Sequence, residues 1–79
     1  MPKLKNWKPK GEMLGFWGHR RYNITVKLSG EWGRWFVIIE DHEFNRFSEK
    51  KEYRRFTTAK NEAIDTMRDL DKDIKEIEG

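Results

Sequence analysis

The hydrophobic period of this chain changes once, and that change limits the folds that it can adopt. In the segment RRYNITVKLSG apolar and polar residues alternate, and the apolar face consists of Tyr22, Ile24, Val26 and Leu28. After residue 58 the apolar residues instead recur mainly at steps of three and four, as Ala63, Ile64, Met67, Leu70, Ile74 and Ile77. A period of two indicates a strand with one buried face, and a period near 3.6 indicates an amphipathic helix. The chain therefore combines strands with a helix that covers their apolar face.

Two further strands complete the predicted sheet. The segment RWFVIIED is β-branched and aromatic, and it follows the first strand closely enough to pair with it as a hairpin. The segment KEYRRF, residues 51–56, predicts a third strand, and Thr58 is the expected N-cap of the helix. We therefore expect an α+β fold, a three-stranded antiparallel β-meander packed against one C-terminal α-helix. Trp35, Val37 and Ile39 would face the helix.

The first 15 residues show neither period. They contain two prolines, two glycines and four lysines, so we expect an extended basic arm over residues 1–15 and a single βββα domain over residues 16–79. A chain of 79 residues has room for one core only.

Charge is distributed unevenly along the chain. Residues 1–60 hold fourteen Lys or Arg against seven Asp or Glu, whereas residues 61–79 hold three against seven. A basic body with an acidic end points toward polyanionic partners. The chain has no cysteine and no apolar run of about 18 residues, the length that a membrane span needs. We expect a cytoplasmic protein with no membrane partner.

The sequence offers little for catalysis. It has no cysteine nucleophile and no glycine-rich phosphate loop. The cluster EDHEF, residues 40–44, is dense in titratable groups, but contiguous ligands in an extended chain point apart and converge poorly on a metal. His19, beside two arginines, is expected to be an exposed polar residue. We expect no enzyme, no metal, no cofactor and no small-molecule substrate.

Basic and aromatic residues interleave in HRRY, WGRW and KEYRRF, and this mixture suits contacts with phosphates and bases. Strand parity predicts an outer sheet face that carries Lys27, Trp32, Arg34, Lys51, Tyr53 and Arg55. The basic arm would add Lys3, Lys5, Lys8 and Lys10. The exposed side of the helix is acidic and would repel phosphate, so the sheet or the arm must meet any nucleic acid.

The segments GEWGRWFVIIED and YRRFTTAKNEAIDTM together resemble the AP2 DNA-binding domain of plant factors. Over roughly residues 20–70 the chain is also similar to the amino-terminal arm-site domains of tyrosine integrases. The resemblance implies a three-stranded sheet backed by one helix, with the sheet in the DNA major groove. It also implies outward side chains at Trp32, Arg34, Lys51, Tyr53 and Arg55.

Two functional hypotheses follow. The first is a small prokaryotic, archaeal or viral nucleic-acid-binding module, with DNA favoured over RNA. The second is a homodimeric structural or protein-interaction domain, because parity leaves Phe36 and Ile38 on the face away from the helix. In that case Trp7, Phe36 and Ile38 would contact the partner.

Overall fold

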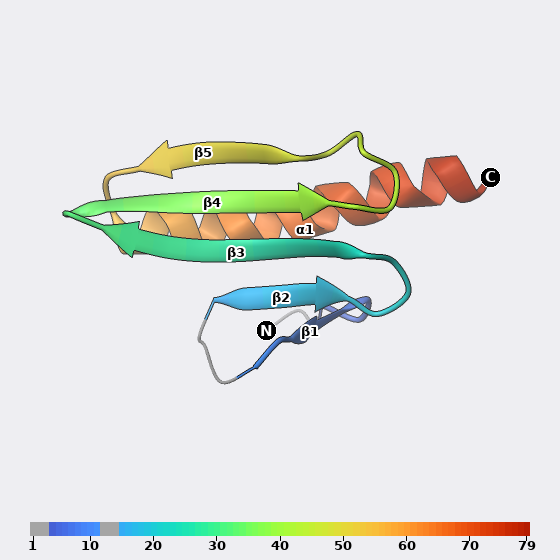
Figure 1. Cartoon of the computed structure of the whole chain (residues 1–79), viewed down its shortest axis with the longest axis horizontal. Coiled ribbons are helices and arrows are strands. Elements are labelled where there is room, and N and C mark those ends of the chain that lie inside the picture. The colour runs from blue at the N-terminus through green and yellow to red at the C-terminus, as the bar shows by residue number, and fades with distance from the viewer. Residues whose placement is uncertain (1–3, 12–14) are drawn as a thin grey trace.

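The chain folds into one antiparallel sheet with a helix across one of its faces (Figure 1). The computed structural model describes residues 4–11 and 15–79. The strands follow each other in space in chain order, and they are β1 (Trp7–Pro9), β2 (Phe16–His19), β3 (Ile24–Glu31), β4 (Arg34–Asp41) and β5 (Glu49–Tyr53). The helix α1 (Phe56–Glu78) contacts β3, β4 and β5.

The expected α+β class with one C-terminal helix is confirmed, but the expected three strands are wrong, because the sheet has five. The two additional strands, β1 and β2, are only three and four residues long. Each is interrupted by proline or glycine, so neither shows an alternating pattern. They are strands because they pair, Trp7 opposite His19 and Trp17 opposite Val26.

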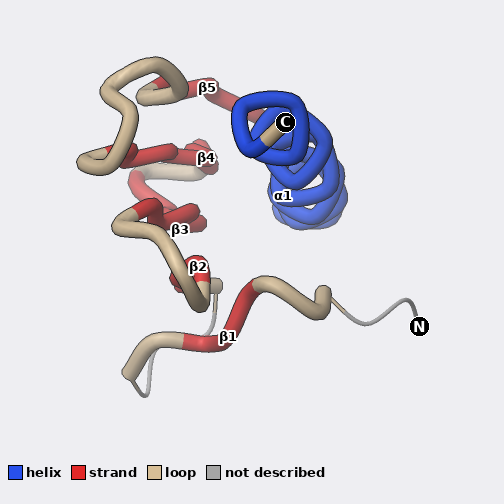
Figure 2. Tube along the Cα trace, turned by 90° about the vertical axis from the view of Figure 1, so that its right-hand side faces the viewer, coloured by secondary structure: helices blue, strands red, loops and turns tan. Residues whose placement is uncertain are grey.

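The β3–β4 hairpin supplies the centre of the core. Its register places Val26 opposite Ile39 and Leu28 opposite Val37. Val26, Val37 and Ile39 are buried, and α1 covers this face of the sheet (Figure 2). The predicted inward face of the hairpin is therefore confirmed.

The helix α1 packs through a narrow stripe of small and medium side chains. The buried members are Ala59, Ala63, Met67, Leu70 and Ile74. Because the two alanines are fully buried, the first turns of the helix approach the sheet closely. The helix begins at Phe56 with Arg55 as the N-cap, without a side-chain cap, so the prediction of Thr58 as N-cap is wrong. No helix in residues 4–11 and 15–79 is long and apolar enough to cross a membrane.

The strand β1 joins the sheet to the far end of the helix. Figure 2 shows β1 turning out of line with the other strands, toward the side that α1 occupies. Trp7 on this strand is buried, and its indole Nε1 donates a hydrogen bond of 2.9 Å to Asp71 of α1. Residues 7–9 therefore belong to the sheet and not to an extended arm, and the expected boundary at residue 15 is wrong.

Candidate nucleic-acid interface

The sheet face opposite α1 has no covering element in the described parts of the chain (Figures 1 and 2). Residues directly opposite each other on neighbouring strands share a face, so the strand register assigns its side chains. We call this surface the open face. Its basic, aromatic and aliphatic members are Lys8, Phe16, Lys27, Arg34, Phe36, Ile38 and Lys50.

Cations and apolar side chains alternate across the open face. Phe16, Lys27, Ile38 and Lys50 lie opposite one another on four neighbouring strands, a row of about 14 Å at the usual strand spacing. The ammonium of Lys50 lies 4.6 Å from the centre of the Phe36 ring, a cation–π contact. Lys50 therefore covers part of the Phe36 ring, which was predicted from the sequence to lie on the uncovered face of the sheet.

The open face also carries the acidic residues Glu31, Glu40 and Glu52. The guanidinium Nη1 of Arg34 lies 3.5 Å from Oε1 of Glu52, and both side chains are largely exposed. Exposed ion pairs contribute only about 0.2–1 kcal/mol. A phosphate can therefore compete with Glu52 for Arg34.

The strand β5 has the opposite facing to the one expected. Tyr53 pairs with Trp35 and Lys51 pairs with Val37, so both point to the helix side. The Tyr53 hydroxyl donates to Glu62 of α1 at 3.5 Å, and burial together with the Glu62 charge raises the pKa of Tyr53. The outward prediction for Lys51 and Tyr53 is wrong, and Arg55 lies at the helix N-cap instead of on a strand.

The amino-terminal lysines that the structure describes do not form one basic arm but lie in different places. Lys8 extends the open face on β1, and Lys5 is exposed. The aliphatic chain of Lys10 passes over Gly18, where a Cβ would lie 2.6 Å from Lys10 Cε. Glycine at position 18 thus allows Lys10 to lie across the sheet. Lys3 is outside the described residues.

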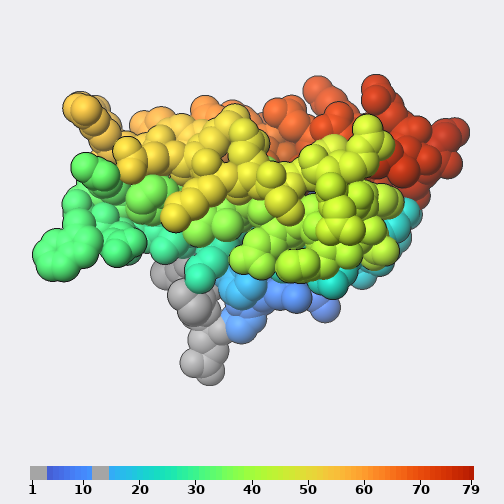
Figure 3. Space-filling model, turned by 45° about the horizontal axis from the view of Figure 1, so that its top comes forward, coloured from blue at the N-terminus to red at the C-terminus, as the bar shows by residue number. Residues whose placement is uncertain are grey.

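Trp32 occupies the tip of the β3–β4 hairpin. Its φ is 50° and that of Gly33 is 74°, which are the two positive values of a type I′ turn. The Trp32 side chain is 94% exposed, and Figure 3 shows this end of the hairpin projecting from the body of the molecule. Glu31, Trp32, Arg34 and Phe36 line a shallow hollow of about 330 Å³ beside the tip.

The three residues predicted to contact a protein partner lie in two different environments. Trp7 is 3% exposed and bonded to Asp71, so the prediction that it contacts a partner is wrong. Phe36 and Ile38 are half-buried and lie on the open face as expected.

His19 is buried and not exposed as expected. Its Nδ1 accepts the backbone N–H groups of Arg21 and Tyr22 at 3.1 and 3.2 Å, which places the proton of the neutral ring on Nε2. Nε2 lies 3.9 Å from Oδ1 of Asp71. Burial lowers the pKa of His19 although the Asp71 charge opposes this. His19 is thus a buried ring beside a hollow of about 560 Å³ near the end of α1.

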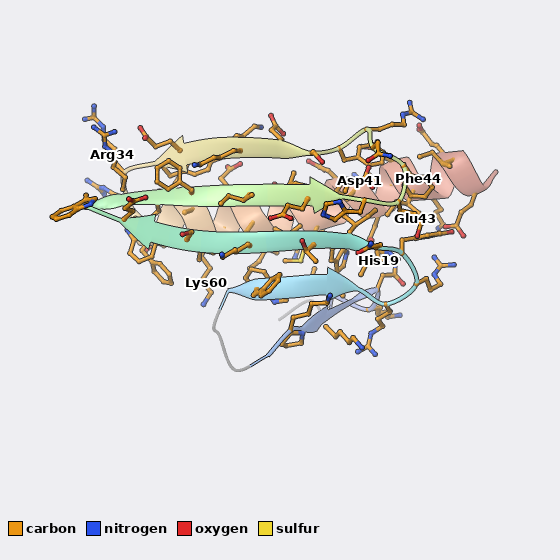
Figure 4. All side chains as sticks on the ribbon, in the orientation of Figure 1. His19, Arg34, Asp41, Glu43, Phe44 and Lys60 are labelled. Carbon is orange, nitrogen blue, oxygen red and sulfur yellow. The ribbon has the colours of Figure 1, made fainter. Side chains whose placement is uncertain are left out.

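The acidic cluster at the other end of β4 is structural. Arg34 and Asp41 mark opposite ends of this strand (Figure 4). The buried Asp41 carboxylate accepts four backbone N–H bonds of 2.8–3.1 Å, from Glu43, Phe44, Arg46 and Phe47. Burial raises the pKa of Asp41, but these four bonds outweigh it and lower the pKa overall. Among the residues that the structure describes, no group of three or more potential ligands is arranged to hold a metal.

The fold and the open face together define a small α+β protein with one covered and one accessible side of its sheet. Comparison of the chain with protein-family models, curated proteins and solved structures gives no match.

Sequence reasoning missed two members of the open face, Phe16 and Lys50. Phe16 lies on β2, a strand of only four residues with no alternating pattern, so the sequence carries no signal for its facing. Lys50 and Lys51 are identical neighbours, so only the pairing of β5 with β4 shows which one faces outward.

Proposed function

We propose that this chain binds nucleic acid through the open face of its sheet. The observation that carries the proposal is the meeting of four cations with two aromatic rings on that face. The helix on the opposite side holds seven acidic against four basic residues. With Glu31, Glu40 and Glu52 included, the open face carries one net positive charge, whereas the helix carries three net negative charges. A polyanion is therefore attracted more to the open face than to the helix side.

The individual roles follow from side-chain chemistry. Lys8, Lys27, Arg34 and Lys50 contact phosphates, and Phe36 packs against a sugar or a base. Lys51 and Tyr53 have no part in this surface because they face α1. DNA is the first polymer to test.

The test is a titration of fluorescently labelled DNA and RNA, repeated at several salt concentrations. Four phosphate contacts predict a slope of about −3 in log affinity against log salt. The double variant Lys27→Gln with Lys50→Gln should reduce that slope by about 1–2. The matched variant Lys60→Gln with Lys72→Gln removes two charges from the helix and should leave the slope unchanged. Equal effects of both pairs, or no binding at low salt, would refute the proposal.

A homodimer closed over the open face is the second candidate. It is favoured by Ile38, an aliphatic side chain at the centre of the face, between Lys27 and Lys50. The same face would then be occupied by a second copy, and its charged residues would pair across the interface.

A further inference from the structure

The turn at the tip of the β3–β4 hairpin contains a residue that the turn itself disfavours. Positive φ at the first central position of a type I′ turn suits Asn, Asp or Gly, whereas a bulky side chain pays for this conformation in steric strain. Trp32 holds this position with φ of 50° and keeps 94% of its surface exposed. Packing within the described residues therefore does not account for a tryptophan here.

The immediate surroundings of Trp32 are chemically mixed. The hollow beside it combines the Phe36 ring, the Arg34 guanidinium and the Glu31 carboxylate. Aromatic rings stack on bases, a guanidinium binds phosphate, and a carboxylate accepts a hydrogen bond from an exocyclic amino group. Each of these groups matches one part of a nucleotide, and together they match a nucleotide whose base is accessible on its flat face.

We propose that Trp32 stacks on an unpaired base and that the hairpin tip directs this protein to single-stranded nucleic acid. This inference rests on the proposed function of the open face. In a duplex the flat faces of the bases are covered by their neighbours, so only a single strand, a loop or an end offers a base to the indole.

The remainder of the open face agrees with a single strand. A rigid duplex backbone laid across the sheet would meet Glu40 and Glu52 as well as the cations. A flexible strand can place its phosphates beside Arg34 and Lys50 and its bases on Phe36, avoiding the carboxylates. The exposed tip thus provides the first stacking position for a base, and the open face provides the contacts for the nucleotides that follow.

The experiment compares the wild type with Trp32→Asn and Trp32→Phe. The probes are a single strand of about 12 nucleotides, within the range that one such module covers, and the same strand annealed to its complement. Stacking on one base predicts that Trp32→Asn weakens single-strand affinity about 5- to 150-fold. Duplex affinity should change less than about 2-fold, and Trp32→Phe should restore most of the single-strand affinity.

Two controls make the outcome specific. Ile77→Asn removes another exposed apolar side chain, near the C-terminal end of α1 and at the opposite end of the molecule from the hairpin tip (Figure 1), and should leave both affinities unchanged. Circular dichroism should show that Trp32→Asn keeps the fold, since asparagine suits the turn.

The two proposals fail in different ways. If the wild type binds neither probe at low salt, the proposed function is wrong and the inference falls with it. If the wild type binds but Trp32→Asn changes neither affinity, or weakens both equally, only the assignment of the tip to single strands is wrong.

Discussion

Replacing Asp41 by asparagine tests whether one carboxylate holds the loop between β4 and β5. In the wild type, Oδ1 accepts the N–H groups of Glu43 and Phe44, and Oδ2 accepts those of Arg46 and Phe47. Asparagine keeps one acceptor oxygen, but its NH₂ group would face the other two N–H donors. Asp41 is 1% exposed, so water replaces the lost acceptor poorly.

The expected magnitude follows from the two orphaned donors. A buried donor without an acceptor costs about 1–3 kcal/mol, so with two such donors Asp41→Asn should lower the free energy of unfolding by about 2–6 kcal/mol. For a domain of this size that corresponds to a fall in Tm of about 8–48 °C. Urea denaturation followed by tryptophan fluorescence measures the difference, and Asp69→Asn, on the exposed side of α1, is the control.

The effect of pH supplies a second check. The folded-state pKa of Asp41 is lowered because the four N–H bonds outweigh the effect of burial. A lowered pKa stabilises the fold fully above the unfolded pKa of about 3.9, and this stabilisation is lost as the pH falls through the folded pKa. The gap between wild type and Asp41→Asn should therefore be constant near pH 7 and shrink below about pH 4. A gap under about 0.5 kcal/mol at pH 7, or one that does not shrink in acid, would refute this reasoning.

Two further predictions concern the open face and its tip. Trp32→Asn should raise Tm by about 2–8 °C, because asparagine relieves about 0.5–1 kcal/mol of strain at positive φ; thermal unfolding monitored by circular dichroism measures it, and an unchanged or lower Tm would show that the indole stabilises the fold. Ile38→Ser should leave the sedimentation coefficient unchanged if the open face binds nucleic acid, whereas conversion of a dimer to a monomer would favour the homodimer instead.

The parts of the fold predicted from sequence are those in which burial sets the pattern. The prediction of which faces of β3 and β4 are buried was correct, because Val26, Val37 and Ile39 must all turn toward α1. Most of the predicted stripe of α1 was correct for the same reason, but Ile77 is exposed and the buried Ala59 was missed. The strands β1 and β2 were missed because their strand geometry depends on pairing with distant residues, such as Trp7 with His19, and not on local preference.

The candidate site was predicted in part. Lys27 and Arg34 lie on the open face as expected, because side chains alternate between the two faces along β3 and β4 and the buried residues of these strands face α1. The strand β5 is polar on both faces, so its sequence, EKKEY, contains no parity to read. The side chains of β5 that face α1 are set by the bond from Tyr53 to Glu62 and by the register with β4. The sequence alone therefore does not distinguish Lys50 from Lys51.

The position of α1 after all five strands imposes an order on biosynthesis. A ribosome releases the sheet first, with the side chains of Val26, Val37 and Ile39 facing water until the helix has followed. At about 5–20 residues per second, the 23 residues of α1 take about 1–5 s to translate. Throughout that interval these side chains lack the helix that covers them, and an uncovered apolar surface is of the kind that chaperones bind. The packing of α1 ends this exposure.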